Sequence, residues 1–178
     1  MGLERYLMGD NNFKSLLNCE NMIPPAPGVY CIRIANPSLL KPSISKVLQQ
    51  RNHNIIYIGM ASKSLKVRFL GQELRAKGHG SFFRSLGAIL GYTPEKGSLV
   101  GKKNQQNYKF SKSHEAEIID WINNNLLVNW VECENDLKHK EEALIAKYLP
   151  LLNISKNPGV LKEVIEARNN CKLIARNN

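Results

Sequence analysis

Two apolar runs rich in β-branched residues predict neighbouring strands in the first third of the chain. The first, residues 28–35, follows a proline-rich breaker at 24–27, and the second, residues 55–59, ends at a glycine. Tyr30 lies in the first run and Tyr57 in the second. Pairing of the two strands would place these phenols side by side.

The segment that joins the two runs, residues 36–54, is too long for a simple hairpin loop. It contains two prolines and a polar stretch, 43–51, that predicts one short helix. Such an insertion is either a site of substrate contact or a tolerated surface addition, and the sequence leaves both interpretations open.

Apolar residues at helical spacing predict several helices. These cover residues 64–77, 81–90, 113–124 with Ser113 as the N-cap, 137–148 up to Pro150, and a last helix after the turn at 157–159. A small helix is expected around 13–17, a strand at 126–131, and a short strand at 108–110 within a basic loop, 92–112. Because strands and helices do not alternate regularly, the pattern favours an α+β fold, a small antiparallel sheet flanked by helices.

Charge adds a class of partner to this picture. The 178 residues suffice for one domain and carry 25 basic against 15 acidic side chains, a formal charge of +10. Basic residues cluster at 63–84 and 102–112, which favours a polyanionic partner such as nucleic acid. The sequence shows no signal peptide and no membrane-spanning run, so we expect a cytoplasmic protein without a membrane partner.

Glu141 is the acidic residue whose position asks for an explanation. At about 100° per residue, the helix over 137–148 places Glu141 near the centre of an apolar stripe, formed by Leu137, Leu144, Ile145 and Tyr148. A carboxylate on an apolar face costs several kcal/mol of desolvation unless a metal ion, an arginine or a hydrogen-bond donor compensates for it. A buried Glu–Arg pair and a metal site are therefore both open interpretations.

A set of short motifs, ordered along the chain, resembles the GIY-YIG nuclease family. The set consists of Gly28-Val29-Tyr30, Tyr57-Ile58-Gly59, Arg68, and Glu141 followed by Pro150 and Asn153 at nine and twelve residues. The resemblance covers 27–155 and implies a nuclease-like catalytic domain with a three-stranded antiparallel sheet. Residues 1–26 would then be an N-terminal extension, and 156–178 a C-terminal helical tail packed on the same domain.

The resemblance also implies roles for individual residues. Glu141 corresponds to the metal-binding glutamate, and a single hard oxygen ligand suits Mg²⁺ or Mn²⁺. Tyr30 would be the base that activates water, with Tyr57 in support. A phenol titrates near about pH 10, so nearby positive charge would have to lower its pKa. Arg68 would hold the scissile phosphate.

Further residues are expected around this set. His79 resembles a histidine of the homing-endonuclease branch, where it would contact phosphate or transfer a proton. Lys63, Lys66, Arg84 and Asn153 are expected to bind the substrate, Asn153 by ordering the site through hydrogen bonds. The excision-repair branch has a lysine where Met60 stands here, so either Lys63 or Lys66 replaces it or Arg68 supplies the positive charge alone.

These observations predict a divalent-metal-dependent endonuclease that hydrolyses phosphodiester bonds, in DNA more readily than in RNA. The alternative is a non-cleaving nucleic-acid-binding module on the same scaffold, whose salt-sensitive binding would not depend on Glu141. No recognisable targeting domain is present in the sequence. We therefore expect a protein partner or a dimer to direct the activity, and specificity to reside in the insertion 36–54 and the loop 92–112.

Overall fold

The computed structural model describes residues 2–177 and has the expected α+β fold. Its antiparallel sheet has the strand order β1-β4-β2-β3, formed by β1 (Lys14–Ser15), β2 (Gly28–Ile34), β3 (Ile55–Ala61) and β4 (Leu126–Glu132). The three long strands are the predicted ones. The two-residue β1 adds a fourth strand where a small helix was expected, because Lys14 and Ser15 pair with Val128 and Leu127.

The register of β2 and β3 places the two tyrosines on one face of the sheet. Tyr30 lies opposite Gly59, and Ile32 lies opposite Tyr57, so the two phenols are diagonal neighbours. Their ring centroids are 6.3 Å apart, with an interplanar angle of 22°. This geometry follows from the period of two along each strand, which points both side chains to the same side.

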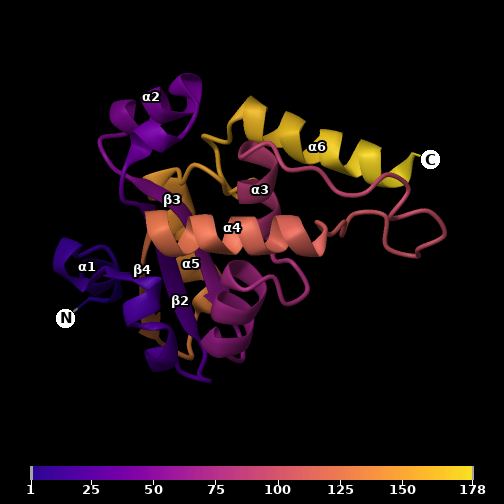
Figure 1. The fold of residues 1–178 in the computed structure, drawn as a ribbon. Coiled ribbons are helices and arrows are strands. Elements are labelled where there is room, and N and C mark those ends of the chain that lie inside the picture. The colour runs from indigo at the N-terminus through magenta and orange to yellow at the C-terminus, as the bar shows by residue number, and fades with distance from the viewer. Residues whose placement is uncertain (1, 178) are drawn as a thin grey trace.

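Helices cover both faces of the sheet (Figure 1). The face that bears the tyrosines packs against η5 (Lys66–Leu74), α3 (Ser81–Ile89) and α4 (Lys112–Asn125). The other face packs against α1 (Leu3–Leu7) and α5 (Leu137–Tyr148). No helix within residues 2–177 is both long and apolar enough to cross a membrane.

Several predicted elements need correction at their boundaries. The helix predicted over 64–77 is the shorter η5, a π-helix. The cap of α4 is Ser111 rather than Ser113, since the Ser111 hydroxyl accepts from the His114 N–H at 3.3 Å. Residues 108–110 form no strand; Tyr108 and Phe110 are instead anchored by burial of their rings. The insertion contains η4 (Pro37–Leu39) and the predicted short helix, α2 (Pro42–Gln50).

The outer edge of β3 is covered by the segment that follows α5. The Leu152 N–H donates to the Ile56 carbonyl at 2.8 Å. The Asn153 side chain then pairs with both backbone groups of Ile58, accepting from its N–H at 3.0 Å and donating to its carbonyl at 2.8 Å. At Ile58, one amide side chain therefore provides the backbone hydrogen bonds that a further strand would otherwise provide.

The last helix, α6 (Lys162–Arg176), packs on α3 and on the basic loop of residues 92–112. The Gly97 and Leu99 N–H groups donate to the Ile174 and Ala175 carbonyls at 3.2 and 2.7 Å. Cys171 and Ala175 are buried at this contact. The C-terminal segment is thus an integral wall of the fold (Figure 1).

Close packing explains why a glycine stands opposite Tyr30. A Cβ at Gly59 would lie 2.5 Å from both the Cζ and the hydroxyl oxygen of Tyr30. We expect Gly59→Ala to lower the free energy of unfolding by about 1–3 kcal/mol, because the fully buried tyrosine has to move. Urea unfolding followed by circular dichroism measures the change.

Gly71→Ala is the matched control for this substitution. A Cβ at Gly71 meets its nearest neighbour at an ordinary 3.5 Å, so this variant should unfold at the same urea concentration or slightly higher. Equal effects of the two alanines would show that the Tyr30–Gly59 contact is not the constraint.

Candidate functional site

A pocket of about 270 Å³ lies at the outer edge of β3 and contains two of the predicted catalytic residues. Tyr57 enters it from β3 and Glu141 from α5, while Asn153 closes it along the strand edge. Ser81 and Ser85 of α3 and Arg168 and Lys172 of α6 form further parts of the wall. Residues from opposite faces of the sheet thus meet where the sheet ends.

Glu141 has no ion-pair partner among the described residues. Burial raises its pKa, and the backbone N–H of Met60 and the Arg68 guanidinium oppose that rise. Leu137, Leu144 and Ile145 on the same helix are buried, as the stripe predicted. A buried Glu–Arg pair therefore does not account for Glu141.

The expected buried Glu–Arg pair does exist, but its carboxylate is Glu73. This side chain is 0% exposed and accepts from Arg68 Nη2 at 2.9 Å and from the Phe82 N–H, near the start of α3, at 2.8 Å. The Tyr30 hydroxyl lies 3.5 Å from its Oε1. Glu73 thus joins Arg68, Tyr30 and the N-terminus of α3 in one network.

The sequence contains a pattern that could have identified Glu73. It follows Leu65 and Phe69 at successive intervals of four residues, so the three share one side of the helix. This is the same argument that identifies Glu141 on its own apolar stripe. Burial raises the pKa of Glu73, and Arg68 and the Phe82 N–H oppose that rise.

The two tyrosines differ in their access to the pocket. Tyr30 is 0% exposed and stacks on Phe69 at a centroid distance of 4.2 Å, whereas Tyr57 is 7% exposed and lines the pocket. Burial raises the pKa of both phenols, and the Glu73 carboxylate raises them further. The lowered pKa that a phenol would need in order to act as a base is not found in the free protein, because burial outweighs the effect of Arg68.

Arg68 is held firmly but is still accessible. Its side chain is 39% exposed; Nη2 contacts Glu73, and Nη1 donates to Gln72 at 2.7 Å. Arg68 lies close enough to both tyrosines and to Glu141 to lower the pKa of each. The structure therefore brings Tyr30, Tyr57, Arg68 and Glu141 together.

The four predicted substrate-binding residues occupy different environments. Lys63, between β3 and η5, and Lys66, the first residue of η5, are both exposed. Arg84 is only 7% exposed, and it is one of the buried polar groups of the structure instead of a surface cation. Asn153 is buried and uses its amide on Ile58.

His79 faces away from the other predicted catalytic residues. It is 2% exposed and packs against Phe83 and Phe110 at centroid distances of 4.9 and 5.9 Å. Its Nε2 lies 3.4 Å from Glu115 Oε1. None of these three residues, Phe83, Phe110 and Glu115, lines the pocket.

The buried position of His79 makes a prediction for stability against pH. Burial lowers its pKa from 6.5 to about 4, although Glu115 opposes the change. The unfolded chain therefore takes up a proton at a higher pH than the folded chain. We expect the free energy of unfolding to fall by roughly 3 kcal/mol as the pH decreases from 6.5 to about 4, the pH range between these two pKa values.

Urea unfolding at a series of pH values measures this slope. The comparison variant is His79→Asn, since asparagine tolerates the positive φ of 55° at this position. The native chain should lose more stability than the variant over the window. Parallel curves would mean that another group carries the acid sensitivity.

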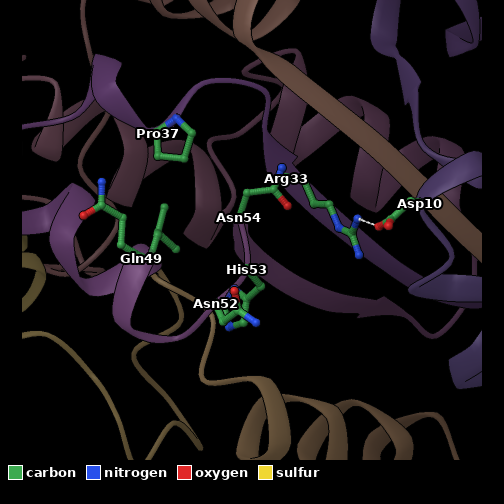
Figure 2. Close-up of a pocket in the computed structure, with 8 residues that line it drawn as sticks. Asp10, Arg33, Pro37, Gln49, Asn52, His53 and Asn54 are labelled. Atoms are coloured by element: carbon green, nitrogen blue, oxygen red, sulfur yellow. Dashed lines mark hydrogen bonds and ion pairs between the residues drawn. The ribbon is translucent and has the colours of Figure 1, made fainter.

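A second pocket, of about 480 Å³, lies at the insertion and shares no lining residue with the first. Figure 2 shows Arg33 facing Asp10 there, with Pro37 and Gln49 of the insertion on the opposite side of the view. Arg33 Nη1 contacts Asp10 at 2.5 Å, and Nη2 donates to the Met8 carbonyl at 2.8 Å. The Arg33 guanidinium is thus bound by groups of the protein itself. Substrate contact by the insertion stays a prediction.

The structure is thus an α+β domain that collects two tyrosines, an arginine and a glutamate around the edge of a small antiparallel sheet. The family model described as the GIY-YIG catalytic domain matches residues 28–172. The chain belongs to this family. Comparisons with curated proteins and with solved structures give no match. The matched span reaches into α6, beyond the motifs named in the sequence analysis.

The residues at the pocket fit a divalent cation that keeps most of its waters. No group of three or more histidine, cysteine or acidic side chains within residues 2–177 is arranged to enclose a metal. Glu141 offers a partly buried carboxylate that has no ion-pair partner in the described part of the chain, and it lines the pocket. One carboxylate, waters and substrate phosphate oxygens are the ligand set typical of Mg²⁺ sites that act on phosphates.

Proposed function

We propose that the chain is a divalent-metal-dependent endonuclease that hydrolyses phosphodiester bonds, with DNA preferred to RNA. The observation that carries the proposal is the Glu141 carboxylate, which shares a pocket with Tyr57 and has no ion-pair partner in the described chain. Family membership supports nuclease-type activity. The clustered positive charge of the sequence supports a nucleic-acid substrate.

In this proposal Glu141 holds Mg²⁺ or Mn²⁺. The metal would polarise the phosphoryl oxygens and make a bound water more acidic. The carboxylate must be ionised to bind it, so binding is lost as the pH falls through the raised pKa of Glu141. Glu141 thus sets the acid limit of the activity.

Arg68 would hold the scissile phosphate and stabilise the charge that develops on it. Its support is the Glu73 contact at 2.9 Å, which fixes the guanidinium while more than a third of the side chain stays exposed. A clamp that is already oriented loses little entropy when the substrate binds. Lys63 and Lys66, exposed nearby in the chain, would add phosphate contacts.

Tyr57 is the tyrosine that we assign to the reacting water or phosphoryl oxygen, because it lines the pocket. Its raised pKa keeps the phenol neutral, so it would orient its partner by donating a hydrogen bond. Tyr30 has no access to the pocket and would act through Glu73, to which its hydroxyl points. This reverses the division of roles that the resemblance implied.

The test is incubation of supercoiled plasmid, linear duplex, single-stranded DNA and RNA with the native chain. Each is run with Mg²⁺, with Mn²⁺ and with chelator. Cleavage that requires the metal supports the proposal, and the ratio of nicked to linear plasmid shows whether two copies act together. Salt-sensitive binding of every substrate without any cleavage would overturn it in favour of a non-cleaving module.

A further inference from the structure

Two cations of the C-terminal helix stand in the wall of the Glu141 pocket. Arg168 and Lys172 are one helical turn apart on α6, and both line it. Arg168 Nη1 is anchored to α3, where it donates to the Ser81 carbonyl at 3.1 Å and to Ser85 Oγ at 2.9 Å. The guanidinium is thus fixed by the same serines that form the adjoining wall.

A third cation lies behind this pair. Arg84 is 93% buried within α3, and its Nε and Nη1 have no hydrogen-bond partner among residues 2–177. The Nε of Arg168 is buried as well and has no partner among these residues. Buried donors of charged groups are seldom left unused, because each one forfeits its hydration without replacement.

These three cations differ from three other partly buried arginines in having no carboxylate partner; Arg51 also has none within the described chain, but it donates to the Leu149 and Gly159 carbonyls. Arg33, Arg68 and Arg75 each have a carboxylate within 4.0 Å, on Asp10, Glu73 and Glu20. In the described chain no ion pair involves Arg84, Arg168 or Lys172. Burial lowers the pKa of Arg84 and of Lys172, and Arg168 lowers both further.

The Glu73 carboxylate partly offsets the charge of Arg84, but the three cations still repel one another, and a bound anion would relieve that repulsion. The cations lie beside a pocket of about 270 Å³ that also contains Glu141 and Tyr57. A phosphate group suits the donors, since a guanidinium offers a planar fork and an ammonium a mobile point charge. The scissile phosphate itself is assigned to Arg68, which is not among the residues that line this pocket.

We propose that Arg168 and Lys172, backed by Arg84, bind a backbone phosphate of the nucleic-acid strand next to the phosphate that is cut. The inference rests on the proposed nuclease function for the identity of the strand. It assigns to α6 a direct part in substrate binding. Two phosphate contacts, one with η5 and one with α6, would then fix the position of the nucleic-acid strand. The bond that is cut would lie between β3, which carries Tyr57, and α5.

The experiment measures binding without cleavage, so that it is independent of activity. A fluorescein-labelled 20-base-pair DNA duplex and its single strand are titrated with protein in chelator, at several salt concentrations. Lys172→Gln removes a cation that makes no hydrogen bond in the described structure. We expect about tenfold weaker binding and a salt slope smaller by about one.

Two further variants separate charge from fold. Arg168→Lys keeps the charge but loses the two anchored hydrogen bonds, and it should weaken binding less than Arg168→Gln does. Lys162→Gln removes a charge from the exposed start of the same helix, where Lys162 faces Glu166 at 3.4 Å. This control should leave both affinity and salt slope unchanged, and circular dichroism confirms that each variant is folded.

The outcomes separate this inference from the proposed function. If folded Lys172→Gln and Arg168→Gln bind with the affinity and salt slope of Lys162→Gln, α6 is no phosphate site and the inference is overturned. If binding weakens as expected but the native chain cuts nothing with Mg²⁺ or Mn²⁺, the α6 site stands while the nuclease proposal fails.

Discussion

Replacing Glu141 with glutamine is expected to lower the cleavage rate by about 10³-fold or more. Glutamine keeps the shape of the side chain but removes the charge that would hold the metal. The loss corresponds to several kcal/mol of transition-state stabilisation. Single-turnover cleavage at saturating protein measures it, because substrate binding and product release then do not limit the rate.

Stability should move in the opposite direction from activity in this variant. The raised pKa of Glu141 means that the folded protein holds this charge at a cost. A neutral amide removes that cost, so the urea midpoint should stay the same or rise. A structural carboxylate would behave differently, since its removal would lower the midpoint.

Glu142→Gln is the matched control for this prediction. Glu142 is the next residue on α5 and lies 3.5 Å from Lys156 on the surface. Its replacement changes the net charge by the same amount in almost the same place. Equal loss of cleavage in both variants would mean that the overall negative charge of this part of α5, and not a metal ligand at position 141, supports the reaction.

Replacing Glu73 with glutamine is expected to reduce both stability and cleavage. The fully buried carboxylate accepts from Arg68 and from the Phe82 N–H, and an amide can satisfy these donors only in part. We expect the free energy of unfolding to fall by about 1–3 kcal/mol. Cleavage should fall by about 10²-fold, since a released Arg68 no longer presents its guanidinium in one orientation.

Comparing how far Glu73→Gln lowers the cleavage rate with how far it weakens DNA binding distinguishes a positioning residue from a purely structural one. A freed Arg68 should lower the single-turnover rate more than it weakens DNA binding in chelator. Glu115→Gln is the control, because Glu115 is also buried and lies 3.4 Å from His79 and 2.7 Å from Lys112. It should lose stability with little change in cleavage. Identical profiles would remove Glu73 from the site.

Local periodicity was enough to predict the strands of the two tyrosines and the stripe that carries Glu141. Both depend on residues close in sequence, and both are present in the fold. The approach of Tyr30, Tyr57, Arg68 and Glu141 rested on the family resemblance, because no local pattern brings α5 to the edge of β3. The identity of the sheet partners was equally beyond local pattern, as the two-residue β1 shows.

Burial and its electrostatic effects could not be predicted from the same patterns. Arg84 and His79 were expected to contact the substrate, but packing of α3 against α4 and α6 encloses them. The tyrosine pKa values rise because η5 and α3 exclude water from the sheet face. Desolvation is a property of the assembled layers, so the sequence could name the charges that would lower a tyrosine pKa but not the burial that outweighs them.

The amide that seals β3 also influences how copies of the chain meet one another. An uncovered edge strand is a template on which a second molecule can add its own strand, and proteins commonly block such edges. Here Asn153 occupies the backbone groups of Ile58, in the middle of the strand that carries Tyr57. Asn153 thus occupies the backbone groups on which a second copy could pair a strand with β3. A loss of activity on changing Asn153 would therefore report colloidal stability as well as chemistry.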